Sequence, residues 1–246
     1  MSWATYKDLL KKHFWFKKEE TKAILITSVL FAFIVSFTQW STDLNEVLRN
    51  YLMAFGIVIL SILVHHSAQR LAALKEGFVA EHKLWWYGSL WSLLITFLSN
   101  GKFQIFLGSG VELTALEKHR VGKGKPGSSH VWEISKICSW GIIANLCLAA
   151  SIKSIDLYFY PLNGFFVEQL YSFNLLYSFY NFFPIPPLDG SKILFANRML
   201  YVFLFSFFLA YLVLIQLFEY YSFIVAAIIA VVLWILFYVF WESERV

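Results

Sequence analysis

The sequence predicts an all-α polytopic membrane protein with about six transmembrane helices, one re-entrant segment and a small β-hairpin insertion. Two properties of the 246-residue chain point to this class: 59% of its residues are hydrophobic and only 15% are charged. A soluble domain is about 45–50% apolar and about 25% charged, so this chain has too little polar surface to coat a water-soluble globule. A disordered chain is excluded because it would need far fewer apolar side chains.

Seven apolar runs are separated by short polar segments, and a helix needs about 20 apolar residues to cross a bilayer. The runs lie at about residues 23–40, 51–73, 84–99, 134–152, 165–183, 200–218 and 222–241. The run 84–99 is the shortest, about 24 Å as a helix, and a full crossing there would place the basic residues that follow it outside the cell. We therefore expect this run to enter and leave the membrane on one side, and the other six runs to cross.

The distribution of charge predicts the orientation. The net charge is +4, and six lysines precede the first apolar run: Lys7, Lys11, Lys12, Lys17, Lys18 and Lys22. Cytoplasmic segments of membrane proteins carry an excess of Lys and Arg, so we expect an integral, multi-pass protein with both termini in the cytoplasm. Because the basic residues flank membrane spans, the partner expected for this charge is the lipid bilayer and not nucleic acid.

Composition divides the chain into four regions. We expect a basic amphipathic cytoplasmic arm at 1–22, a first span and outer loop at 23–50, a central core at 51–198, and two C-terminal spans with a tail at 199–246. Within the core, residues 100–132 are the one mostly soluble stretch. Phe103–Leu107 and Val111–Ala115, joined by Gly108-Ser109-Gly110, predict the β-hairpin, and the glycine-rich segment that follows predicts a basic loop.

Ionisable side chains at the ends of two apolar runs are candidates for a functional site, because such groups are costly in a membrane. His65 and His66 end one run, and Asp189 follows a proline-rich stretch after another. Prolines stop a helix, and irregular backbone at membrane depth is tolerated only where it is buried in protein or lines a wet cavity. Both runs lead from the outer to the inner side. We therefore expect His65 and Asp189 to meet, and together they are ingredients of a metal centre.

The proline-rich stretch has a specific likeness. Asn181-x-x-Pro184-x-Pro186-x-Leu188-Asp189-Gly190 resembles the N-x-x-P-x-P-x-L-D-G signature of the site-2 protease family of intramembrane zinc metalloproteases. The resemblance covers roughly residues 51–198 and implies a site-2-protease-like core. It also implies zinc as the cofactor and transmembrane segments of membrane proteins as partners.

Two weaker elements agree with this resemblance. Gly141-Ile142-Ile143-Ala144-Asn145 resembles the family's G-P-x-x-N, with an isoleucine in place of the proline. Two glycines lie where the family carries a β segment thought to pair with an unwound substrate strand. The resemblance implies substrate contacts at Asn145, Asn181, Gly108 and Gly110.

The sequence departs from the family at the catalytic helix. In the family, H-E-x-x-H places two zinc-binding histidines on one helix face, with the glutamate as general base. Here the stretch is His65-His66-Ser67-Ala68-Gln69. The resemblance therefore implies His65, Asp189 and Gln69 at the metal-ligand positions and His66 at the general-base position. A neutral amide is a poor substitute for imidazole on zinc, so zinc is the metal expected if any binds, and no metal is the alternative.

Each of these residues also has an ordinary structural interpretation. Asp189 could cap the helix that follows it. His66 could be solvated at the membrane interface, and Gln69 and Asn145 could form hydrogen bonds between helices.

The residues leave several functions open. The first is a catalytically impaired site-2-protease homologue, a pseudoprotease that binds transmembrane segments of partner proteins. The alternative is an active intramembrane zinc metalloendopeptidase with an altered metal site, in which the metal polarises the peptide carbonyl and activates water. A transporter or channel that uses the histidine and the aspartate as an ion path agrees less well, because the sequence has no internal repeat.

Overall fold

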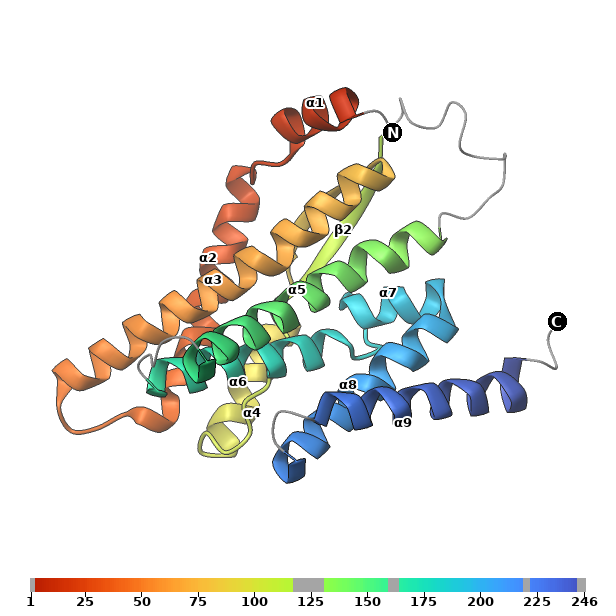
Figure 1. The fold of residues 1–246 in the computed structure, drawn as a ribbon. Coiled ribbons are helices and arrows are strands. Elements are labelled where there is room, and N and C mark those ends of the chain that lie inside the picture. Colours follow the sequence, from red (N-terminus) through yellow and green to blue (C-terminus); the bar gives the residue numbers. More distant parts are fainter. Residues whose placement is uncertain (1–2, 117–130, 159–163, 219–221, 243–246) are drawn as a thin grey trace.

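The computed structural model describes residues 3–116, 131–158, 164–218 and 222–242. These residues are mostly helical and contain one small two-stranded sheet (Figure 1). The elements are α1 (Trp3–His13), α2 (Lys18–Ser36), α3 (Leu44–Glu76), β1 (Phe78–Leu84), α4 (Trp86–Leu98), β2 (Ser109–Ala115), α5 (Val131–Tyr158), α6 (Gly164–Asn181), α7 (Asp189–Ala196), α8 (Arg198–Phe218) and α9 (Ser222–Phe237). A 3₁₀ turn at Phe37–Gln39 extends α2, and a π turn at Tyr238–Glu242 extends α9.

Four helices among the described residues are long and apolar enough to cross a membrane: Lys18–Gln39, Leu44–Glu76, Val131–Asp156 and Ser222–Trp241. They contain four of the six predicted crossings. The protein therefore has the helices of a multi-pass membrane protein. The other two predicted crossings correspond to α6 and α8. Both runs are helical, and their crossing of the bilayer stays a prediction, as does the orientation of the termini.

The predicted β-hairpin is wrong in its pairing. Phe103–Leu107 forms no strand; β2 pairs instead with β1 in antiparallel register, with Phe78 opposite Ala115 and Leu84 opposite Ser109. The strand β1 follows α3 directly, because Gly77 ends that helix with a left-handed φ of 83° that favours glycine. Local pattern could not predict this partner, since it lies far from β2 in the sequence. The basic part of the predicted loop, 117–130, lies outside the described residues.

The α4 segment leaves the sheet and returns to it. The Trp85 backbone N–H, just before α4, donates to the carbonyl of Gly108, just before β2, over 2.9 Å. At the far end of α4 the Phe97 ring packs edge-on against Phe37 at the end of α2, with centroids 5.2 Å apart. This path has the form of the predicted re-entrant segment, and its place in the membrane stays a prediction.

Two apolar clusters hold the helices around the central polar residues. One joins α2, α3 and α6 and includes Phe31, Ile57 and Tyr177. The other joins β1, β2, α5, α6, α7 and α8 and includes Ile142 and Phe182. In Figure 1, α3, α5 and α6 cross the middle of the molecule, and α8 and α9 pack against each other beside them. The polar residues on the inner faces of α3, α5 and α7 therefore lie between the two clusters.

Candidate functional site

His65 and Asp189 meet inside the protein. His65 lies in the middle of α3, and Asp189 is the first residue of α7, directly after the proline-rich segment. Nε2 of His65 lies 2.9 Å from Oδ2 of Asp189, and both side chains are almost completely buried. Within the described residues the Asp189 side chain makes no hydrogen bond to the backbone of α7, because Oδ2 contacts His65 and Gln69 and the buried Oδ1 has no partner. The Asp189 side chain therefore links α3 to α7 and does not cap the N-terminus of α7.

Gln69, one turn after His65, contacts the same carboxylate oxygen. Its Nε2 donates to Oδ2 of Asp189 over 2.6 Å, while its Oε1 lies 3.0 Å from Nδ1 of His66. A carboxylate only accepts hydrogen bonds, so the amide must turn its nitrogen toward Asp189 and its oxygen toward the protonated Nδ1 of His66. His66 and Gln69, the two positions where the sequence departs from the H-E-x-x-H pattern, are thus bonded to each other.

A third histidine joins this group from β1. The rings of His66 and His82 lie edge to face with centroids 4.1 Å apart. Within the described residues, both nitrogens of His82 and Nε2 of His66 are buried without a hydrogen-bond partner. Burial, assisted by the charge of nearby His65, lowers the pKa of His82 to about 4. Sequence reasoning did not single out His82. The alternation along β1, with Phe78, Ala80 and His82 on the buried face, could have revealed it.

The absence of a side chain at Gly141 allows α5 to approach this group closely. A Cβ at Gly141 would lie 2.6 Å from Nε2 of His65 and 2.8 Å from Cγ of Gln69. Either distance is too short for real atoms. The glycine of the weaker sequence element is therefore needed for α3 and α5 to pack at the site.

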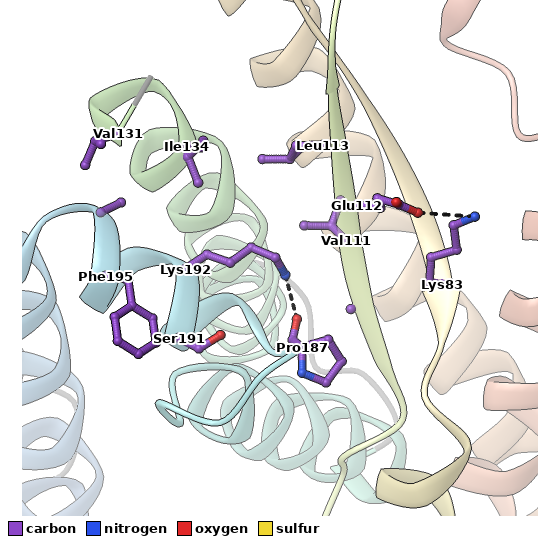
Figure 2. A pocket seen from close by; sticks show the side chains of 12 residues that line it. Lys83, Val111, Glu112, Leu113, Val131, Ile134, Pro187, Ser191, Lys192 and Phe195 are labelled. Carbon is purple, nitrogen blue, oxygen red and sulfur yellow. Dashed lines mark hydrogen bonds and ion pairs between the residues drawn. The ribbon is translucent and has the colours of Figure 1, made fainter. Parts of the chain in front are cut away.

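A groove lies between β2 and α7, the helix that begins at Asp189. It has a volume of about 640 Å³ and is lined largely by apolar atoms. Figure 2 shows Val111 and Leu113 of β2 on one side and Phe195 of α7 on the other. At its base, Nζ of Lys192 donates to the carbonyl of Pro187 over 2.5 Å.

The four residues expected to contact a substrate lie in different places. Gly110 lines the groove, and a Cβ there would lie 2.6 Å from the carbonyl oxygen of Pro187. Gly108 instead packs against Phe31 of α2. The Asn181 amide donates to the carbonyl of Tyr177 over 2.9 Å. Asn145 is fully buried in α5, and neither atom of its amide has a partner among the described residues.

The arrangement does not fit a zinc ion. Among the described residues no three His, Cys, Asp or Glu side chains are placed to hold a metal. Gln69 turns a donor toward Asp189, whereas a metal ligand must present a lone pair. Nε2 of His65 is already hydrogen-bonded to the carboxylate.

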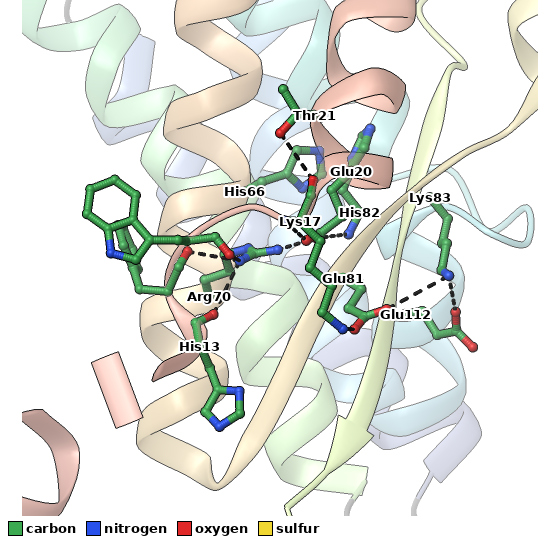
Figure 3. Close-up of polar contacts among 12 residues, drawn as sticks. His13, Lys17, Glu20, Thr21, His66, Arg70, Glu81, His82, Lys83 and Glu112 are labelled. Atoms are coloured by element: carbon green, nitrogen blue, oxygen red, sulfur yellow. Dashed lines mark hydrogen bonds and ion pairs between the residues drawn. The ribbon is translucent and has the colours of Figure 1, made fainter. Parts of the chain in front are cut away.

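Sequence reasoning missed a second buried group on the same helix. Arg70 forms a buried ion pair with Glu20, and Glu20 also accepts the backbone N–H of His82 over 2.9 Å. Figure 3 shows this network between α2, α3 and β1, with Lys17 paired to Glu81 nearby. The signal was present as a charged residue one turn after His66, within the apolar run 51–73.

Comparison with known proteins adds no relative. No family model, curated protein or solved structure matches this chain. The likeness to site-2 proteases therefore depends on the residues named above.

Proposed function

We propose that this chain is a site-2-protease-like pseudoprotease, a membrane protein that binds transmembrane segments of partner proteins without cleaving them. The observation that carries this proposal is the double contact at Asp189, whose Oδ2 accepts from His65 and from Gln69. The carboxylate is engaged by protein donors where the family would offer it to a metal.

The general base needed for peptide hydrolysis is also missing. In the family the general base is the glutamate beside the first histidine, and here that position is His66. His66 is engaged with Gln69 through Nδ1 and packs on His82. Loss of a general base alone slows a reaction by about 10²–10⁴-fold. We therefore expect no cleavage on the timescale of family enzymes.

The edge of β2 and the groove beside it, by contrast, could bind a transmembrane segment. Among the described residues β2 pairs only with β1, so its second edge can accept an extended segment, because an unpaired strand edge carries free N–H and C=O groups. The groove between β2 and α7 lies beside that strand, and its apolar lining suits the side chains of an unwound membrane helix.

Photo-crosslinking tests this proposal. The probe is a synthetic peptide with one apolar span of about 20 residues, broken at its centre by Asn-Pro. A benzophenone amino acid is placed at Leu113, which lines the groove, or at Thr114, the exposed neighbour on the other face of β2. We expect crosslinks at 113 in several-fold excess over 114, with the peptide intact. Equal crosslinking at both positions would overturn the binding proposal.

One observation favours a second candidate, the active zinc metalloendopeptidase with an altered site. Two of the family's three ligand positions, His65 and Asp189, do meet. Metal analysis and a cleavage assay separate the candidates. Stoichiometric zinc that disappears in His65→Ala, together with peptide cleavage that disappears in Asp189→Asn, would establish the enzyme and reject the pseudoprotease.

A further inference from the structure

The exposed face of α1 combines aromatic and basic side chains. Trp3 is 68% exposed, and Trp15, just after the helix, is 76% exposed. Lys7, Lys11 and Lys12 lie between these tryptophans, all exposed. Trp3, Lys7 and Lys11 are four residues apart and so form one stripe along the helix. Within the described part of the chain, these three lysines form no ion pair.

Other groups of this segment are bonded to α3. The Tyr6 hydroxyl donates to the Leu71 carbonyl over 3.3 Å. Nη1 of Arg70 donates to three consecutive carbonyls, those of His13, Phe14 and Trp15, at 3.3, 2.9 and 3.0 Å. These carbonyls stand at the C-terminal end of α1, where unpaired acceptors and the helix dipole favour a cation. The orientation of α1 is therefore set by the protein.

That orientation places α1 beside the N-terminal end of the first candidate span, where this span would meet the membrane surface. The first candidate span begins at Lys18, only five residues after α1 ends at His13. Figure 1 shows α1 at one end of the helix bundle, bent away from the direction of α2. The exposed stripe thus continues the surface that the apolar helices present to lipid.

We propose that Trp3–Lys18 is a docking surface for the anionic headgroups of a phospholipid bilayer. Lysines are attracted to anionic headgroups, and tryptophan prefers the interface between headgroups and hydrocarbon. The hold of Arg70 on the end of α1 orders this surface before lipid binds, so little conformational freedom is lost on docking. The occupant is a lipid surface and not an acidic protein or a second copy of the chain, because the stripe is continuous with a membrane span.

The test uses the full-length protein in nanodiscs that hold one copy each. Ala4, exposed beside the stripe, is replaced by cysteine in a Cys147→Ala background and labelled with the fluorophore NBD; the remaining Cys138 is buried. The measurement is the rate at which dithionite quenches the label. Discs of phosphatidylcholine alone are compared with discs that also contain phosphatidylglycerol.

We expect quenching to be slower by about fivefold or more in the anionic discs, since each lysine near an anionic surface contributes about that factor. The protection is lost at high salt and in the variant Lys7→Gln/Lys11→Gln/Lys12→Gln. The control Lys75→Gln/Lys102→Gln/Lys136→Gln changes the net charge by the same amount and should retain the protection from quenching. Equal quenching in both discs, protection that survives removal of the three arm lysines, or protection only with two copies per disc would each overturn the proposal.

Discussion

Gln69 turns its amide nitrogen toward Asp189, and the two atoms Nε2 and Oδ2 lie 2.6 Å apart. A zinc site would require an electron pair at this position. With a donor there, Oδ2 accepts hydrogen bonds from His65 and Gln69, while Oδ1 stays buried without a partner among the described residues. In this arrangement the amide of Gln69 and the carboxylate of Asp189 form a hydrogen-bonded contact between α3 and α7.

Introducing the H-E-x-x-H motif into α3 should create a metal site. In His66→Glu/Gln69→His, residues 65, 69 and 189 supply two imidazoles and a carboxylate, the three protein ligands of many catalytic zinc sites. We expect about one zinc per chain, measured by elemental analysis after dialysis. Adding Asp189→Asn should remove it. A folded double variant without zinc would contradict the proposed kinship with site-2 proteases.

The close approach of α5 to α3 should make Gly141 intolerant of any side chain. Gly141→Ala forces the new methyl against His65 and Gln69, and overpacking of this kind costs about 1–3 kcal/mol of unfolding free energy. Gly56→Ala on α3 is the matched control, because a Cβ there has no atom within 4 Å. That variant should be neutral or slightly stabilising, since alanine is the better helix former. Unfolding in detergent measures both, and equal effects would argue against the close contact.

The ion pair of Arg70 with Glu20 should be costly to break from one side. Both side chains are about 4% exposed, so Arg70→Met leaves a carboxylate buried without its cation, at a cost of about 3–5 kcal/mol. Adding Glu20→Gln should recover part of this loss. Lys22→Met, which breaks the exposed pair with Glu19, should change unfolding little. If Arg70→Met changes the unfolding free energy only slightly, water reaches the Glu20 carboxylate and the ion pair is not buried.

His82 should make the protein less stable in acid. Its pKa is about 4 in the folded protein and near 6.5 in an unfolded chain. The unfolded state therefore binds a proton first as the pH falls. Stability is full above about pH 6.5 and declines toward pH 4, by up to about 3 kcal/mol. His82→Phe should remove this part of the pH dependence, and His13→Phe, at the partly exposed end of α1, should retain it. If stability depends on pH in the same way in His82→Phe and in the parent protein, His82 is not the group that causes the loss of stability in acid.

Several features of the site could be predicted from the sequence. The signature around Asp189 and the direction of two apolar runs predict its meeting with His65, and the structure places the two side chains 2.9 Å apart. The proline-rich signature marks Asp189 and the end of an apolar run marks His65, so both residues could be selected from the sequence.

Composition and the apolar runs by themselves determined the class of the protein, because burial of so much apolar surface leaves a membrane as the only compatible solvent. Only the tertiary structure decided that β2 pairs with β1, that His82 is buried against His66, and that Arg70 holds the end of α1. Each of these contacts joins segments far apart in the chain. Hydrophobic periodicity reports which face of an element is buried, but it carries no information about which distant residue that face will meet.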